Sequence, residues 1–208
     1  MKRQEVWVFG AGGHAKVVID CAKSAGAQLL GLFDDDPALA GLDIGGLRVL
    51  GGRAEVARLL PGHPDAGFVI AIGRNDLRAQ IAATVSGAAA PALVHARATV
   101  ENSVTLGLGT VVFAGAVINA DARIGEHVIV NTCSCIDHDC VVGDFVHVAP
   151  GARICGGVEV GAGSLVGAGC VIVPGIKVGA GCVLGAGAVV LDDIPAGTRV
   201  AGNPARPL

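Results

Sequence analysis

Aromatic residues are scarce in this sequence: one Trp, no Tyr and five Phe among 208 residues, or 3% of the chain. Nevertheless 52% of the residues are hydrophobic, and 33 are Gly. Aromatic rings fill much of an ordinary globular core. Here branched aliphatic side chains must do so, which is typical of a solenoid whose interior is narrow and repeats along its axis.

The chain also lacks a long apolar run and a strong charge. No stretch approaches the ~20 apolar residues of a membrane span, and the apolar segment 6–9 is too short for a signal peptide. The net charge of −3 gives no attraction to nucleic acid or to an anionic membrane. We therefore expect a cytoplasmic protein with neither partner, and its seven Cys should be free thiols.

A period of six governs the second half of the chain. Every sixth residue from Val94 to Val190 is Val, Ile or Leu, seventeen times in succession. A coil with three flat sides of six residues has this period, and the aliphatic residues then point at its axis. The series is Val94, Val100, Leu106, Val112, Ile118, Ile124, Val130, Ile136, Val142, Val148, Ile154, Val160, Val166, Ile172, Val178, Leu184 and Val190.

Two further positions of the repeat support this interpretation. The residue four places after each aliphatic one is nearly always small and never charged, which lets a narrow corner close without overpacking. The residue directly after it is often Gly, which tolerates tight turns. Residues 91–190 thus predict about five and a half turns, on the order of 27 Å tall. The proline-containing tail 191–208 should cap the open end. Three of the small positions are Cys140, Cys170 and Cys182, which we expect to be buried.

Residues 1–90 follow a different pattern. Apolar runs of strand length alternate with helical patterns, which predicts βαβ units and a small parallel sheet. A further short element is expected near Val49. The sequence thus predicts a Rossmann-like α/β domain at 1–90 and a solenoid domain with its cap at 91–208. Strands are expected at 6–9, 28–33 and 68–72, and helices at 15–24, 54–60 and 76–85.

A glycine loop at residues 10–15 follows the first strand and opens the first helix. Backbone N–H groups at a helix start bind phosphate well, and Asp34 ends the next strand, where an acidic residue can meet a ribose or a base edge. The loop matches a dinucleotide fingerprint. However, the unit has half the size of a two-nucleotide fold, so we expect one nucleotide diphosphate rather than NAD. His14 would lie beside the phosphate. The alternative is a tight turn without a ligand.

A polar segment, Asn131–Cys140, interrupts the otherwise featureless repeats. His138 stands two places after an inward Ile, so it should point outward, and Asp139 can orient its imidazole as a general base. His147 lies nine residues, or half a turn, further on. The two histidines could therefore meet one ligand only across a subunit boundary or along an extended substrate. The alternative is two solvated histidines. The spacing of Cys133, Cys135, His138 and Cys140 matches no familiar zinc site, so no metal is expected.

These motifs together resemble the NeuD-like sialic acid O-acetyltransferase family of hexapeptide-repeat acyltransferases. Within it the similarity is greatest to nucleotide-sugar N-acetyltransferases of the PglD and PerB type, and it covers essentially the full length. It rests on 10–14 with 16–18, on 33–35, 70–75, 131–132, 136–144 and 147–148, and on the tail 200–205.

The resemblance implies properties that the spacing does not show. The parallel β-helix would be left-handed, and a homotrimer would carry active sites between neighbouring subunits. Acetyl-CoA would acetylate the 4-amino group of a nucleotide-linked amino sugar, with His138 as general base and Asp139 as its orienting acid. PglD has Glu where this chain has Asp139. Acetyl-CoA would contact His147, Gly156, Ala168 and Ala186. The substrate would contact Gly12, Gly13, His14, Asp34, Asp35 and Gly73, with Asn131 at the sugar amine.

Other functions remain open at this point. A sugar O-acetyltransferase would use the same base. A γ-type carbonic anhydrase needs two zinc-binding His five residues apart, whereas His127, His138 and His147 are separated by eleven and nine. A sugar-nucleotide pyrophosphorylase would need a long Gly-Thr-Arg loop, which is missing from the first half. A non-catalytic scaffold would not explain the polar segment, and acetyl-CoA should not raise its melting temperature.

Overall fold

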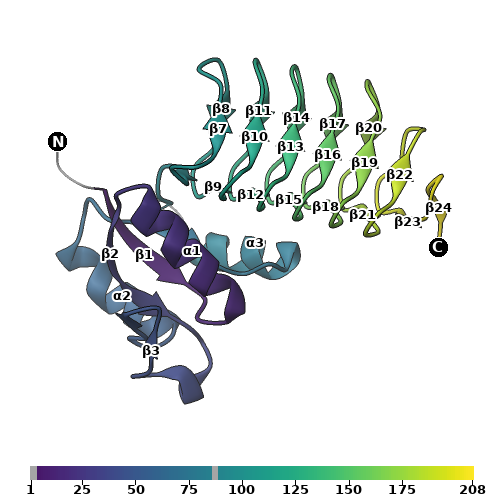
Figure 1. Ribbon diagram of the computed structural model, residues 1–208. Coiled ribbons are helices and arrows are strands. Elements are labelled where there is room, and N and C mark those ends of the chain that lie inside the picture. The colour runs from purple at the N-terminus through teal and green to yellow at the C-terminus, as the bar shows by residue number, and fades with distance from the viewer. Residues whose placement is uncertain (1–3, 86–88) are drawn as a thin grey trace.

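The computed structural model describes residues 4–85 and 89–208, and Figure 1 shows an N-terminal α/β unit beside a long stack of coils. Residues 1–3 and 86–88, which belong to the predicted 1–90 domain, lie outside the described residues.

The N-terminal unit is built on a three-stranded parallel sheet in the order β2–β1–β5. Alternate residues of β1 face opposite sides: Val6 and Val8 pack with α1, whereas Trp7 and Phe9 join a second cluster with side chains of α2 and α3. The predicted strands and helices are confirmed, with ends that differ by at most two residues. They are β1 (Glu5–Phe9), α1 (Gly13–Ser24), β2 (Gln28–Phe33), α2 (Arg53–Leu59), β5 (Gly67–Ile70) and α3 (Asn75–Thr84).

The short element expected near Val49 is a small hairpin. Strands β3 (Asp43–Ile44) and β4 (Leu47–Arg48) pair antiparallel around Gly45 and Gly46, both with positive φ. Val49 itself forms an isolated bridge with Leu32. Single 3-10 turns lie at Pro37–Leu39 and Leu60–Gly62.

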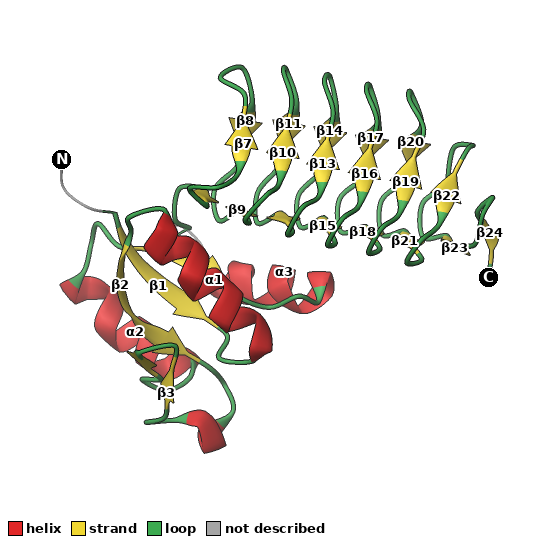
Figure 2. Cartoon of the chain, in the orientation of Figure 1, coloured by secondary structure: helices red, strands yellow, loops and turns green. Residues whose placement is uncertain are grey.

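The solenoid is a three-sided prism whose strands β6 to β22 have two residues each, and Figure 2 shows its coils stacked along one axis. Each strand pairs in parallel with the strand eighteen residues on, as Val117 does with Cys135. One side is a six-stranded sheet (β7 to β22), one a five-stranded sheet (β8 to β20), and one an eight-stranded sheet that starts at β6. We call these the six-, five- and eight-stranded faces. The strands are β6 (Leu93–Val94), β7 (Thr99–Val100), β8 (Thr105–Leu106), β9 (Val111–Val112), β10 (Val117–Ile118), β11 (Arg123–Ile124), β12 (Ile129–Val130), β13 (Cys135–Ile136), β14 (Val141–Val142), β15 (His147–Val148), β16 (Arg153–Ile154), β17 (Glu159–Val160), β18 (Leu165–Val166), β19 (Val171–Ile172), β20 (Lys177–Val178), β21 (Val183–Leu184) and β22 (Val189–Val190).

The interior of the prism matches the period of six. Each strand ends in one of the seventeen aliphatic residues, and these pack with the small corner residues in one continuous core. Cys140, Cys170 and Cys182 are buried there, as predicted, and all seven cysteines are free thiols. The aromatic rings of the solenoid segment lie outside this core: Phe113 packs against the N-terminal unit, and Phe145 stacks on His127.

The tail closes the far end of the prism. Strand β23 (Arg199–Ala201) extends the eight-stranded face, and β24 (Arg206–Pro207) pairs with it antiparallel. At the near end, the N-terminal unit packs on the eight-stranded face, where Leu93, Val111 and Ile129 join the core cluster of α1. The N-terminal unit therefore covers the first coils of one face and leaves the other two faces open.

Candidate active site

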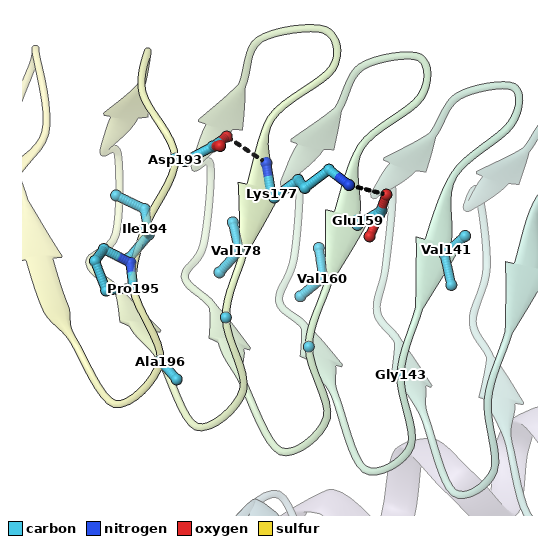
Figure 3. Close-up of a pocket in the computed structure, with 12 residues that line it drawn as sticks. Val141, Gly143, Glu159, Val160, Lys177, Val178, Asp193, Ile194, Pro195 and Ala196 are labelled. Atoms are coloured by element: carbon cyan, nitrogen blue, oxygen red, sulfur yellow. Dashed lines mark hydrogen bonds and ion pairs between the residues drawn. The ribbon is translucent and has the colours of Figure 1, made fainter.

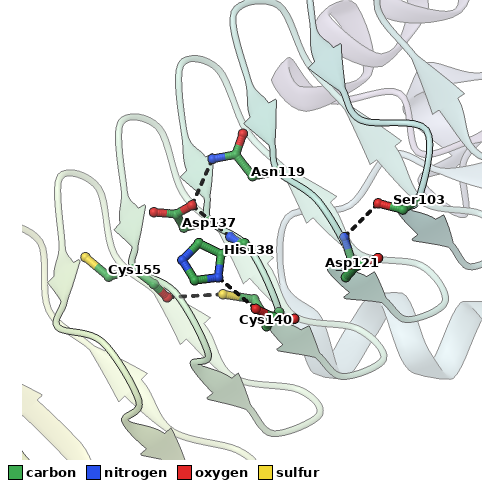
Figure 4. A network of polar contacts seen from close by, with 8 residues as sticks. Ser103, Asn119, Asp121, Asp137, His138, Cys140 and Cys155 are labelled. Atoms are coloured by element: carbon green, nitrogen blue, oxygen red, sulfur yellow. Dashed lines mark hydrogen bonds and ion pairs between the residues drawn. The ribbon is translucent and has the colours of Figure 1, made fainter.

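His138 lies at the turn between β13 and β14, on the edge that joins the six- and five-stranded faces (Figure 4). The next residue, Asp139, has a φ of 60°, and this left-handed turn brings its carboxylate back to the imidazole. The distance from Nδ1 to Oδ2 is 2.8 Å. Both side chains are exposed, at 61% and 66%. The hydrogen bond to Asp139, followed by the charge of Asp137, raises the pKa of His138. The shorter Asp, in place of the Glu of PglD, therefore still reaches the histidine.

Gly156 lies beside His138 on the next coil. A Cβ atom on Gly156 would stand 2.6 Å from both Cε1 and Nε2 of the imidazole. Nδ1 is bonded to Asp139, so in the neutral ring Nε2 carries the free lone pair. The missing side chain of Gly156 leaves room for that nitrogen.

Two residues that sequence reasoning missed support this histidine. The Oδ1 atom of Asp137 accepts hydrogen bonds from Asn119 Nδ2 (2.9 Å) and from the His138 backbone N–H (2.8 Å) (Figure 4). The bond from Asn119, followed by that from His138, lowers the pKa of Asp137, so this carboxylate stays ionised beside the imidazole. Asn119 precedes Asp137 by eighteen residues, which is one turn of the solenoid. This period was the signal that could have placed the two side chains next to each other.

The second part of the site is a cavity of about 370 Å³ in the N-terminal unit. It contains six of the seven residues predicted for the substrate: Gly12, Gly13, His14, Asp34, Asp35 and Gly73. Gly12 is the N-cap of α1 and Gly13 its first residue, and both have open space where a Cβ would stand, so their backbone is accessible. In contrast, a side chain at Gly10 would meet Ala71 O at 2.8 Å, and its φ is +108°. Gly10 therefore shapes the turn.

The two aspartates of this cavity have different partners. Asp34 accepts the backbone N–H groups of Ala11 (2.8 Å) and Asp36 (2.9 Å), so it holds the glycine loop against the end of β2. Asp35 binds Arg53 at 2.7 Å, and this hydrogen bond is the main cause of its lowered pKa. Each carboxylate oxygen of Asp34 thus accepts one backbone N–H, whereas Asp35 is paired with the charge of Arg53.

His14 and His147 meet where the N-terminal unit touches the solenoid, with ring centroids 6.3 Å apart. Burial, followed by the charge of Arg78, lowers the pKa of each to about 4. Both rings are therefore neutral at pH 7. The buried Nε2 atom of His14 has no hydrogen-bond partner, and such an atom is costly unless a ligand or water completes it.

Asn131 lies outside the cavity but is linked to it through His147. Its Nδ2 atom donates to His147 Nε2 at 3.0 Å, and His147 Nδ1 donates to Gly73 O at 3.3 Å. Asn131 Oδ1 accepts the Thr132 N–H at 2.8 Å, which fixes the orientation of the amide. Both ring nitrogens of His147 are thus occupied, which makes it unsuited to act as a base.

The four residues predicted to contact acetyl-CoA lie in three places. His147 borders a groove of about 460 Å³ on the eight-stranded face, together with Gly73 and Asn75. Gly156 lies beside His138. Ala168 and Ala186 are exposed on the edge between the eight- and six-stranded faces. One chain does not gather them around a single cavity.

A further groove of about 560 Å³ contains none of the predicted site residues. It lies on the five-stranded face and is lined by Gly143, Gly161 and Gly179 (Figure 3). Lys177 contacts two acidic residues in this groove. Its Nζ atom lies 2.8 Å from Glu159 Oε1, and its backbone N–H donates to Asp193 Oδ1.

Within residues 4–85 and 89–208, no group of three His, Cys, Asp or Glu side chains could hold a metal ion. None of the helices over the same residues has the length and apolarity needed to cross a bilayer.

Comparison with known families defines the class of protein. The family "PglD N-terminal domain" matches residues 5–85, and "Bacterial transferase hexapeptide (six repeats)" matches residues 139–173 and 157–192. Together with the three-sided coil, these matches identify a left-handed β-helix acyltransferase with an N-terminal α/β unit.

Solved structures narrow this class. The acetyltransferase domain of PglB from Neisseria gonorrhoeae, in complex with acetyl coenzyme A, is 38% identical, with a TM-score of 0.91 and all of both chains covered. PerB from Caulobacter crescentus, in complex with CoA and GDP-perosamine, is 36% identical, with a TM-score of 0.92 over 98% of this chain and 97% of that one. WeeI from Acinetobacter baumannii is 28% identical, with a TM-score of 0.86 and 99% and 100% coverage. The chain belongs to the PglD/PerB-type acetyltransferases, as its motifs predicted.

One curated protein also matches. "Uncharacterized protein L142" of Acanthamoeba polyphaga mimivirus is 29% identical over 107 residues, which are 51% of this chain and 21% of that protein. The chain therefore spans about a fifth of the length of this relative.

Proposed function

We propose that the protein transfers the acetyl group of acetyl-CoA to the 4-amino group of a nucleotide-linked amino sugar, in the cytoplasm. The observation that carries this proposal is the His138–Asp139 pair at 2.8 Å, with a free Nε2 and a raised pKa, on an acetyltransferase fold. The relatives support the two ligands, since one was solved with acetyl coenzyme A and another with GDP-perosamine.

In this mechanism the sugar amine attacks the thioester carbonyl while Nε2 of His138 takes a proton from the amine nitrogen. A new C–N bond forms, and the C–S bond of the thioester breaks. The proton on His138 then passes to the sulfur, so coenzyme A leaves as the thiol. Asp139 stabilises the imidazolium that forms in between. The backbone N–H of Gly156, next to the imidazole, would stabilise the oxyanion. No step requires a covalent acyl-enzyme.

The N-terminal cavity would hold the nucleotide. Accessible N–H groups at the start of the twelve-residue helix α1 suit a diphosphate, and the unpaired Nε2 of His14 offers one further polar contact. A buried neutral His gives a hydrogen bond without the cost of a buried charge. Asp34 lines the same cavity and would bind the ribose or the base.

The two parts of the site lie on different sides of one chain. The nucleotide cavity adjoins the eight-stranded face, whereas His138 stands on the edge between the other two faces. A sugar held by the cavity would therefore reach His138 of a neighbouring subunit more readily than that of its own chain. This placement supports a homotrimer with shared sites, in which Ala168 and Ala186 would line the acetyl-CoA groove and Asn131 would meet the sugar amine.

Release of free thiol from acetyl-CoA tests the proposal. The acceptors are UDP-, GDP- and dTDP-linked 4-amino sugars, each beside its 4-hydroxyl counterpart. We expect turnover of an amine, and a fall of about 10²–10⁴-fold in His138→Ala without loss of assembly. His63→Ala, which changes a half-buried histidine of the N-terminal unit that does not line the cavity, is the control. Turnover of the hydroxyl sugars alone, or an unchanged rate in His138→Ala, would refute the proposal.

A further inference from the structure

The first turn of α3 lies across three successive coils of the solenoid. Arg78 Nε donates to His127 O at 2.8 Å, Arg78 Nη2 donates to Phe145 O at 2.7 Å, and Asn75 Nδ2 donates to Gly163 O at 3.0 Å. These three carbonyl groups are eighteen residues apart, so they occupy the same turn position on consecutive coils. The three residues that carry them, His127, Phe145 and Gly163, have left-handed φ values of 52°, 57° and 71°. In this conformation the turn carbonyls face α3.

The other donors of Arg78 hold the loop that lines the nucleotide cavity. Nη1 donates to Ile72 O at 3.0 Å and to Gly73 O at 3.4 Å, and Nη2 also donates to Asn75 Oδ1 at 2.8 Å. Gly73 O is the atom that accepts His147 Nδ1 as well. One guanidinium therefore connects the cavity loop to the solenoid beside His147.

Arg78 is only 1% exposed, and all of these bonds go to neutral oxygen atoms. Burial lowers its pKa to about 10, so it remains a cation at neutral pH. A buried charge is costly unless its donors are matched. The planar guanidinium can bind several carbonyls in fixed directions, which Lys cannot. The observed contacts use this capacity to fix the position of one domain on another.

We propose that Arg78 is a positioning residue for acetyl transfer: it fixes the nucleotide cavity on the solenoid, so that a bound nucleotide presents its sugar at a set distance from Asn131 and His147. This rests on the proposed function, because the nucleotide sugar is the ligand whose placement Arg78 sets. The guanidinium acts through the loop 72–75 and does not touch the reacting atoms.

The kinetic test compares a nucleotide-linked 4-amino sugar with the same amino sugar lacking the nucleotide. In Arg78→Met we expect the ratio of the two kcat/KM values to fall by about 10–100-fold, because a misplacement of about 1 Å can cost ~10²-fold. The free sugar does not depend on the cavity. A general loss of folded enzyme would lower both values equally. Arg58→Met, which removes an exposed arginine paired with Glu55, is the matched control. An unchanged ratio overturns the proposal.

The titration of His147, followed by NMR, is a readout that needs no activity. The charged and titratable groups that act on this ring are Arg78 and His14. Arg78 also acts on His127, which lies beside Asp144. In Arg78→Met the titration should move upward from a pKa of about 4, because a repelling charge is gone. Arg78→Lys keeps the positive charge, so the pKa of His147 should stay low. It cannot make the same set of hydrogen bonds, so the ratio of the two kcat/KM values should still fall. If Arg78→Met does not fold, Arg78→Lys and Asn75→Ala are compared instead.

The outcomes separate the two proposals. If the wild-type protein acetylates no nucleotide sugar, the proposed function fails, while the His147 titration still tests the junction. If that titration is unchanged in folded Arg78→Met, Arg78 does not set the His147 environment, and the positioning role is refuted whatever the activity.

Discussion

Gly156→Ala tests the geometry of the proposed base with a single methyl group. The new Cβ would stand 2.6 Å from Cε1 and Nε2 of His138 and 3.2 Å from Cδ2. Carbon atoms in contact are ~3.5–4.0 Å apart, so the imidazole must move by about 1 Å. The φ of Gly156 lies outside the left-handed region, so Ala fits the backbone itself. Because His138 is exposed, its ring can swing into solvent, and the thermal stability should hardly change.

The displaced ring should lose its alignment with the substrate and its bond to Asp139. A shift of about 1 Å can cost ~10²-fold in rate, so we expect kcat for thiol release to fall by about that factor. Differential scanning fluorimetry would establish that the fold is kept. Gly62→Ala is the control, since nothing lies within 4 Å of its added Cβ and its φ is also not left-handed. If Gly156→Ala keeps full kcat while His138→Ala is inactive, the base does not work from the observed orientation, and the reasoning is wrong.

Three further predictions concern protonation and assembly. Asp139→Asn should return the pKa of His138 toward its ordinary value, so the acidic limb of the kcat/KM profile should move to lower pH; Asp121→Asn, at the same left-handed turn one coil earlier, should leave it in place. His14 and His147 have folded pKa values of about 4 against 6.5 when unfolded, so the unfolded chain binds more protons between these values. Stability is then complete above pH 6.5 and should fall by about 3 kcal/mol per histidine as pH drops to 4; urea denaturation of His147→Asn should show a smaller loss. Mixed trimers of His138→Ala and His14→Ala should regain about a quarter of wild-type activity if each site spans two subunits; no recovery on co-expression would contradict shared sites.

The solenoid was predictable because its order is local and repeated. From β6 to β22 each strand has two residues, and the same aliphatic position recurs in every one. One period therefore determines on which face a strand lies, with which strand it pairs and which of its side chains is buried. The α/β unit was predictable to within two residues for the same kind of reason, since apolar runs and helical patterns alternate there. The hairpin β3–β4 was not foreseen as such, although the pair Gly45–Gly46 between two short strands is a known hairpin signal.

The site was predictable only where a motif is contiguous. Gly12, Gly13 and His14 follow one another between the first strand and the first helix, and Asp34 directly follows the next parallel strand, so the order of elements already places them at one cavity. Asn119 supports Asp137 from the previous coil, and only the eighteen-residue period could have revealed it. His147 was predicted for the acetyl-CoA groove, and it does border a groove, but its nitrogens are held by Asn131 and Gly73. Its role toward acetyl-CoA stays a prediction.

Arg78 shows why the contacts between the N-terminal unit and the solenoid could not be predicted from the sequence. Its partners are mainly backbone carbonyl groups, at His127 and Phe145, which are 49 and 67 residues away and carry no side-chain signature. A carbonyl is present at every residue, so only the packing of α3 on the edge of the prism selects these. The same packing places the cavity of the N-terminal unit beside the eight-stranded face and leaves the edge of His138 open. Under the proposed function, the relation between the two domains, rather than any motif within either, would decide which subunit's His138 a bound sugar can reach.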